Sequence, residues 1–323
     1  MKSSQKTFDL GFGDPVCVRE TLCKMYSLPL SLIQLKDITY PNPLGNPDLV
    51  EKLSAFKDLT GNKNIVITTG ANQAINLILR VLKKEGRSTI SKNTPSFMYY
   101  DDIIDRSGFI RENNWSNSSD VVLLDWPSNP DGLMGSNWKL FQNDFVWDSV
   151  YNTPTYVNIK LPEPKGWRFK IGGFSKLTGL SGLRIGWIVC RDKKDLDAIS
   201  YELKYENCGI SSVSQSIALD VIEKLDFETF YKLSNVKINL NRDEVQKISR
   251  IFDGQKLPVN GMFYSVRANK KSLGILKKAG INFITLIEDN KEPLIRLSLG
   301  QSNSVTGDAV KTILKVDKIG GRK

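Results

Sequence analysis

The stretch that decides the fold is Gly172–Trp187, GGFSKLTGLSGLRIGW. It places Lys176 and Arg184 eight residues apart in a run of small and apolar residues. Because lysine is normally a surface residue, a lysine in such a run indicates a site that uses a buried amine. The flanking segments RFKIGGFS and LRIGWIVC are predicted as strands on either side of a glycine-rich turn.

Outward from this stretch, strands and helices are predicted to alternate. NIVITT (64–69) has the pattern of a short buried strand, and GANQAINLILRVLKKEG (70–86) that of a helix ending at Gly86. Further strands are expected at STIS, DVVLLDWP and DFVWDSVY, whereas 107–120 is expected to be an irregular loop. This alternation favours an α/β fold with a mostly parallel sheet flanked by helices, whose ligand sites lie at the carboxyl ends of the strands.

The last third of the chain predicts a different organisation. SQSIALDVIEKL and FYKLSNVKINLNRDEVQKISRIF have helical spacing, and GMFYSVRAN and PLIRLSLG are typical of antiparallel strands. We therefore expect a large domain over 35–211 and a smaller α+β domain formed by 1–34 and 212–323.

The amino-acid composition limits which side chains can carry out a reaction. The 323-residue chain contains no histidine, which excludes histidine bases, histidine triads and zinc sites with histidine ligands. Its four cysteines lack metal-binding spacing, so reduced packing thiols are favoured over disulfides and no metal site is predicted. Lysine, tyrosine, carboxylates or a cofactor must then carry any reaction.

The charge pattern bears on partners. A formal net charge of +10 favours acidic partners such as phosphorylated metabolites, nucleotides or nucleic acid. A lysine-rich solvated surface is the favoured alternative, because the charges are spread along the chain. The first residues lack the apolar run of a signal peptide, and no run reaches the roughly eighteen residues of a membrane span. A cytoplasmic protein without membrane association is expected.

Polar residues fall at the predicted strand ends. Asn129 follows VVLLDW, Asp148 ends DFVWD with Tyr151 three residues later, and Gly70–Asn72 open the helix after NIVITT. Each of these is, alone, typical of a turn or cap. Together with Lys176 and Arg184 they meet the requirements of pyridoxal phosphate. These are an amine for a Schiff base, a carboxylate for the ring nitrogen, an amide and a phenol for the ring oxygen, and a helix start with a cation for the phosphate.

On these residues the chain resembles the class I/II aminotransferase family of fold-type I pyridoxal-phosphate enzymes. SKLTGLSGLR resembles the segment that carries the family's cofactor lysine and phosphate arginine, DWPSNPDG its NPxNPTG motif, and DSVY its D-x-x-Y motif. TTGANQA, PSF, PLIRLSLG and YPNPLGNPDLVEKL match other family segments, so the resemblance covers nearly the whole chain. It looks closest to the histidinol-phosphate aminotransferase branch, which also contains threonine-phosphate decarboxylase-like enzymes.

The resemblance implies a role for each matching residue. Lys176 would be catalytic, forming the Schiff base and moving the Cα proton, while Arg296 would bind the substrate carboxylate beside Gly13. Tyr40 would reach the phosphate site of a neighbouring subunit, which implies a homodimer with shared active sites. The implied cofactor contacts are Gly70, Ala71, Asn72, Phe97 (stacked on the ring), Asn129, Asp148, Tyr151, Ser175, Lys176, Arg184 and Tyr40.

The reaction implied is transamination of a small amino substrate, expected to be anionic because of the net charge. Two alternatives stay open. One is a pyridoxal-phosphate-dependent decarboxylase of a phosphorylated, nucleotide-linked or nucleic-acid-linked amino acid, in which the carboxylate would be held perpendicular to the ring. The other is a non-catalytic nucleic-acid-binding relic of the fold. The complete set of cofactor and carboxylate residues favours an enzyme over the relic.

Overall fold

The large sheet has seven strands in the order β2-β8-β7-β6-β5-β3-β4. The computed structural model describes residues 7–29, 38–56, 64–112, 114–116, 118–132, 144–159, 164–288 and 291–320. β8 runs antiparallel to both of its neighbours and the other pairs are parallel, so the predicted mostly parallel sheet is confirmed. The strands are β2 (Ile65–Thr68), β3 (Thr89–Lys92), β4 (Ile110–Glu112), β5 (Val121–Asp125), β6 (Asp144–Asp148), β7 (Phe169–Gly173) and β8 (Gly186–Cys190).

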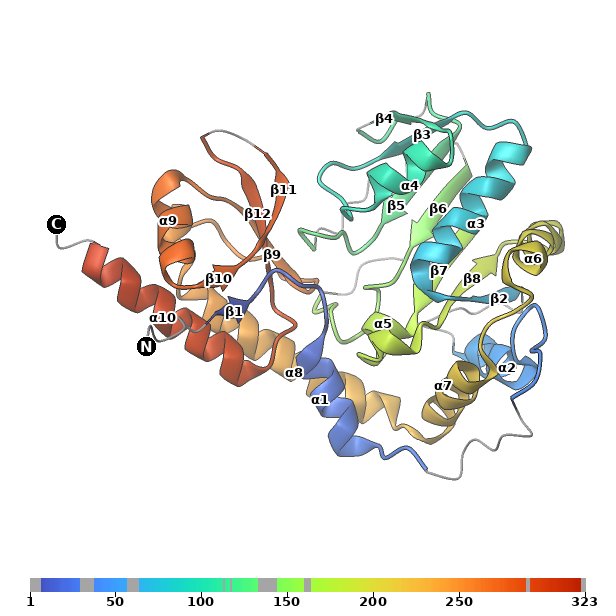
Figure 1. Cartoon of the computed structure of the whole chain (residues 1–323), viewed down its shortest axis with the longest axis horizontal. Coiled ribbons are helices and arrows are strands. Elements are labelled where there is room, and N and C mark those ends of the chain that lie inside the picture. The colour runs from blue at the N-terminus through green and yellow to red at the C-terminus, as the bar shows by residue number, and fades with distance from the viewer. Residues whose placement is uncertain are drawn as a thin grey trace, which may run out of the picture.

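Helices flank this sheet. The predicted helix after NIVITT is α3 (Gly70–Lys84), which buries Ala74, Leu77, Ile78 and Val81 and packs against β7 and β8. Figure 1 shows α3 lying along the sheet. The remaining helices of this part are α1 (Val16–Met25), α2 (Pro47–Ala55), α4 (Tyr100–Arg106), α5 (Phe174–Leu177), α6 (Lys193–Asn207) and α7 (Ser212–Lys224).

A second, smaller sheet lies beside the first part in Figure 1, reached through the long helix α8 (Phe227–Gln246). Its three strands are antiparallel, as predicted, in the order β11-β12-β9. These strands are β9 (Phe263–Arg267), β11 (Ile284–Ile287) and β12 (Leu294–Ser298). The helices of this part are α9 (Lys270–Lys278) and α10 (Asn303–Gly320), and a separate two-stranded sheet pairs β1 (Phe8–Asp9) in parallel with β10 (Ile281–Asn282). The domain division at residue 211 stays a prediction, and α7, which follows that residue, packs against α2 in the core of the first part.

One sequence prediction is wrong and another is only partly tested. Within 107–120, expected to be irregular, β4 pairs in parallel with β3. Its three residues form an edge strand and Ile110 is 66% exposed, so no apolar alternation marks it. The helical spacing of NPDLVEKLSAFKDLTG predicts a helix that ends at Gly61; the observed helix ends at Ala55, and 57–63 lie outside the described residues. Within the described ranges, no helix combines the length and hydropathy needed to cross a membrane.

Glycines in the Gly172–Trp187 stretch allow two close approaches. A Cβ on Gly172 would lie 2.3 Å from the Trp187 indole, so the Trp187 side chain can lie over its register partner on β7 only because that partner is a glycine. A Cβ on Gly186 would lie 2.6 Å from the carbonyl carbon of Gly70. The first residue of β8 therefore fixes how closely the start of α3 approaches the sheet.

Replacing Gly186 by alanine is expected to destabilise the protein by about 1–3 kcal/mol, because the added methyl group meets the backbone of Gly70 and cannot be avoided by a rotamer change. The measurement is urea unfolding at neutral pH. Gly182→Ala is the matched control from the same segment, since nothing lies within 4 Å of a Cβ there. Equal stability of the two variants would contradict the packing argument.

Candidate active site

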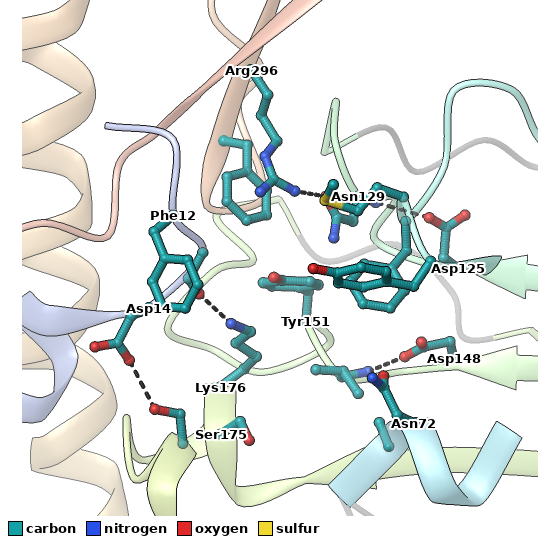
Figure 2. A pocket seen from close by; sticks show the side chains of 18 of the residues that line it. Phe12, Asp14, Asn72, Asp125, Asn129, Asp148, Tyr151, Ser175, Lys176 and Arg296 are labelled. Atoms are coloured by element: carbon teal, nitrogen blue, oxygen red, sulfur yellow. Dashed lines mark hydrogen bonds between the residues drawn. The ribbon is translucent and has the colours of Figure 1, made fainter. Parts of the chain in front are cut away.

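Lys176 points into a cavity of about 310 Å³ from α5, the short helix that follows β7 (Figure 2). The hydroxyl of the fully buried Tyr156 donates a hydrogen bond to the carbonyl oxygen of Lys176 at 3.0 Å, which fixes the lysine backbone. The Lys176 amine donates to the carbonyl oxygen of Gly13 and lies 5.7 Å from the centre of the Tyr151 ring. Burial lowers the pKa of this amine to about 8, so about a tenth of it is neutral at pH 7, far more than for an ordinary lysine.

Asp148, the last residue of β6, is held by two donors. The Tyr100 hydroxyl donates to its Oδ2 at 2.7 Å, and the backbone N–H of Val150 donates to its Oδ1 at 3.0 Å. Burial raises the pKa of Asp148, while both hydrogen bonds lower it. The site thus provides a partly buried carboxylate whose ionised form is hydrogen-bonded on both oxygens.

Arg296 lies on β12, across the cavity from the large sheet (Figure 2). Its guanidinium stacks 4.1 Å from the centre of the Phe263 ring and donates to the Asn129 side-chain oxygen and to the Gly11 carbonyl, each at 3.2 Å. Its Nε is buried without a hydrogen-bond partner in the described residues. Because Arg296 lines the cavity and a guanidinium can bind a carboxylate through two N–H groups, this side chain is suited to receive a ligand carboxylate.

Arg184 lies against the start of α3. Its backbone is left-handed (φ 56°), and its guanidinium donates to the Ser181 carbonyl at 3.1 Å and the Thr69 carbonyl at 3.5 Å. Gly70 has φ 75°, and a Cβ there would lie 2.7 Å from Arg184 Nη2, so only glycine permits this contact. Thr69 makes no side-chain cap on α3. The helix start and the guanidinium therefore form one anion-binding corner.

The structure brings most of the predicted site residues to this one cavity. Gly70 lies beside Arg184 at its edge. Tyr40 is 93% exposed and does not line the cavity, so its predicted role stays a prediction about a second subunit. The predicted residues that line the cavity are Gly13, Ala71, Asn72, Phe97, Asn129, Asp148, Tyr151, Ser175, Lys176, Arg184 and Arg296.

The lining residues that sequence reasoning missed include Phe12, Asp14, Tyr100 and Asp125. Asp14 pairs with Arg19, with oxygen–nitrogen distances of 2.8 and 2.6 Å, and lies near the lysine. Tyr100 and Asp125 stand inside segments already quoted for other residues, PSFMYY and VVLLDW. The position of Asp125 at a strand end was the same signal that identified Asp148.

The donor set fits pyridoxal phosphate. The start of α3 and Arg184 match the phosphate, and Asp148 matches a protonated ring nitrogen. Phe97 lines the same cavity with an aromatic ring, and Lys176 supplies an amine of lowered pKa.

Comparisons with known proteins agree with this geometry. The family model described as "Allinase" matches residues 57–251, more than half of the chain. This chain belongs to the Allinase family. The fold of this Allinase family chain is similar to that of the aromatic aminotransferase from Pyrococcus horikoshii, with a TM-score of 0.80 and 16% identity, covering 98% of this chain and 97% of the other. The predicted fold-type I aminotransferase architecture is thereby confirmed.

Curated relatives of this Allinase family chain are more partial. The 3-methylarginine biosynthesis aminotransferase ArgM of Streptomyces arginensis is 24% identical over 56% of this chain and 58% of its own length. The aspartate aminotransferase of Sulfolobus acidocaldarius is 23% identical over 75% of this chain and 69% of its own length. The chain spans about half the length of the first curated relatives it matches. Membership of the histidinol-phosphate branch stays a prediction.

Proposed function

We propose that this chain is a pyridoxal-phosphate-dependent aminotransferase. The observation that carries the proposal is the placement of Lys176, Asp148, Arg184 and Arg296 around one cavity, each with the partners its role requires. Bound pyridoxal phosphate would supply an electron sink that makes the substrate Cα proton acidic. The residues of the chain then decide which bond is broken.

Each residue has a distinct task in this proposal. Arg296 binds the substrate carboxylate from the cavity wall, with Asn129 fixing the guanidinium. Lys176, neutral above its lowered pKa, takes the Cα proton and returns it. Asp148 keeps a proton on the ring nitrogen, and Arg184 with the start of α3 holds the phosphate.

The cavity favours a substrate with an apolar or aromatic side chain. Phe12, Met98 and Tyr99 line it while remaining 65%, 41% and 49% exposed, so an apolar side chain would cover them. Among the described lining residues, the three cations are Lys176, Arg184 and Arg296. Each already has a role in the proposal, in proton transfer, phosphate binding and carboxylate binding respectively. The expected anionic character is met by the α-carboxylate, and a second anionic group would need a cation from a partner subunit.

The deciding experiment is to add pyridoxal phosphate to the purified protein, follow the visible absorbance of the bound cofactor, and then add single amino acids with a 2-oxo acid acceptor. Loss of that absorbance with formation of a new 2-oxo acid supports transamination. Release of carbon dioxide instead would contradict transamination and support the decarboxylase alternative. A protein that binds neither pyridoxal phosphate nor amino acids would remove the enzyme assignment and leave the nucleic-acid-binding alternative.

The rate at which cofactor-free protein combines with pyridoxal phosphate is expected to rise with pH and to be half-maximal near pH 8. Only the neutral amine reacts, and burial lowers the pKa of Lys176 to about 8. Asp14 raises that pKa, so Asp14→Asn should move the profile to lower pH. The measurement is the absorbance rate at each pH. A midpoint near the ordinary lysine value of 10.5 would contradict the assignment.

Replacing Phe12 by alanine is expected to lower kcat/KM for phenylalanine or tyrosine about tenfold, because the side chain that covers Phe12 loses an apolar contact. The loss should be smaller for alanine, which cannot reach that surface. Initial rates with the two donors give the ratio. An equal loss for both would show that Phe12 does not contact the substrate side chain.

We also infer a homodimer with shared active sites. Tyr40 is the basis, because a 93% exposed tyrosine outside its own chain's cavity is suited to an interface. Sedimentation would give the oligomeric state. Tyr40→Phe should weaken pyridoxal-phosphate binding in the dimer if the hydroxyl reaches the neighbouring phosphate.

A further inference from the structure

Asp125 and Asp148 are the last residues of two adjacent parallel strands and are direct register partners. Strands in a sheet are about 4.8 Å apart, so the backbones of the two residues lie side by side at the sheet edge, and each carboxyl group has its own hydrogen-bond partners. Both line the cavity, and Asp125 is only 4% exposed. Because the negative charge of one carboxylate disfavours ionisation of a neighbouring one, one of the two is expected to keep its proton.

The hydrogen bonds distinguish the two groups. Asp148 receives a donor on each oxygen, from Tyr100 and from the backbone of Val150. Asp125 receives one, from the backbone N–H of Asn129 to its Oδ2 at 3.0 Å. Its Oδ1 is buried without a partner among the described residues (Figure 2). A buried ionised oxygen without a donor is costly, and protonation of the carboxyl group removes that buried charge.

The electrostatic surroundings act in the same direction. Burial raises the pKa of Asp125 well above its ordinary value, the charges of Asp148 and Asp131 raise it further, and the Asn129 hydrogen bond opposes them. The other titratable or charged groups that line this cavity are Asp14, Tyr99, Tyr100, Asp148, Tyr151, Lys176, Arg184 and Arg296.

We propose that Asp125 is a neutral carboxylic acid in the folded protein and acts as a positioning residue. Its Oδ2 fixes the backbone of Asn129, whose side-chain oxygen in turn receives the Arg296 guanidinium. Because Asp125 is neutral, it does this without placing a second anion beside Asp148. The need for an ionised Asp148 rests on the proposed function, whereas the protonation state of Asp125 can be measured without it.

The test is urea unfolding of cofactor-free wild type and Asp125→Asn between about pH 5 and pH 7. A group whose folded pKa is raised holds a proton that the unfolded chain releases, so its stabilising contribution is lost as pH rises. The unfolding constant of the wild type relative to Asp125→Asn should therefore increase about tenfold per pH unit. A ratio that does not change with pH would mean that Asp125 is ionised when folded and would overturn the proposal.

Infrared spectroscopy provides a second measurement that needs no stability comparison. The carbonyl band of a buried protonated carboxyl group should be present in the wild type at neutral pH, absent from Asp125→Asn and retained in Asp148→Asn. If Asp125→Asn does not fold, retention of the band in Asp148→Asn still supports the proposal, and absence of the band from the wild type overturns it. Both experiments use cofactor-free protein, so loss of the aminotransferase assignment would not change their outcome.

The positioning role has its own test. Asp125→Ala removes the acceptor for the Asn129 N–H and should raise KM for the amino acid more than it lowers kcat, because Arg296 loses its fixed partner. Asp125→Asn keeps a neutral side-chain oxygen that can accept from the Asn129 N–H and an N–H that can donate. Its KM should therefore lie much closer to the wild-type value than the KM of Asp125→Ala. If the asparagine variant is as impaired as the alanine variant, the neutral-acid role is wrong.

Discussion

Replacing Lys176 by alanine is expected to lower kcat for the proposed transamination by about 10⁴-fold, the upper end of what one acid–base group contributes. The variant loses the only amine among the described lining residues of the cavity, which both joins the cofactor and moves the Cα proton in the proposed mechanism. The measurement is single-turnover formation of the 2-oxo acid. Added methylamine should restore part of the rate, since a small amine can take up the vacated space and carry the proton.

Two controls separate this effect from unfolding. Lys176→Arg keeps the positive charge but cannot become neutral, so it should be as inactive as the alanine variant. Wild-type Lys176 binds fewer protons when folded than when unfolded between about pH 8 and 10.5, so cofactor-free wild type should gain stability as pH rises through that window. Lys176→Ala should lack this gain. An alanine variant with wild-type turnover would refute Lys176 as the catalytic residue.

The sequence predicted the parts of the site that lie where a strand ends. Asp148 and Asn129 follow apolar runs long enough to be strands, and parallel strands bring their carboxyl ends to one edge. β8 returns antiparallel to β7 after the predicted glycine-rich turn, and Gly172 and Gly186 allow Trp187 and the start of α3 to approach closely. Local patterns of this kind depend only on neighbouring residues.

Contacts set by register or by loops could not be predicted in this way. Asp125 is a candidate functional residue because it is the register partner of Asp148, and this register is known only once the sheet has formed. Tyr100 reaches Asp148 across 48 residues of sequence, and Phe12 reaches the cavity from the segment between β1 and α1. The three-residue strand β4 has too few residues for any periodicity to show.

Replacing Asp148 by asparagine is expected to lower kcat by about 10²- to 10³-fold, with a smaller effect on KM for the amino acid. The amide occupies the same volume and can still accept the Val150 N–H or the Tyr100 hydroxyl, but it has no charge to keep a ring nitrogen protonated. The measurement is kcat and KM at neutral pH, together with the visible spectrum of the bound cofactor. Wild-type kcat in this variant would exclude Asp148 as the partner of the ring nitrogen.

Tyr100→Phe is the graded companion of that variant, since it keeps the carboxylate and removes only one of its donors. The Tyr100 hydrogen bond lowers the pKa of Asp148 against the effect of burial, so its loss should raise that pKa. Activity of Tyr100→Phe should then decline at a higher pH on the acidic side than the wild type does, whereas the pH midpoint of pyridoxal-phosphate association, which Lys176 sets, should stay near 8. If the acidic limb does not move, Tyr100 serves packing alone, and the charge of Asp148 must be maintained by the Val150 N–H and by the cofactor itself.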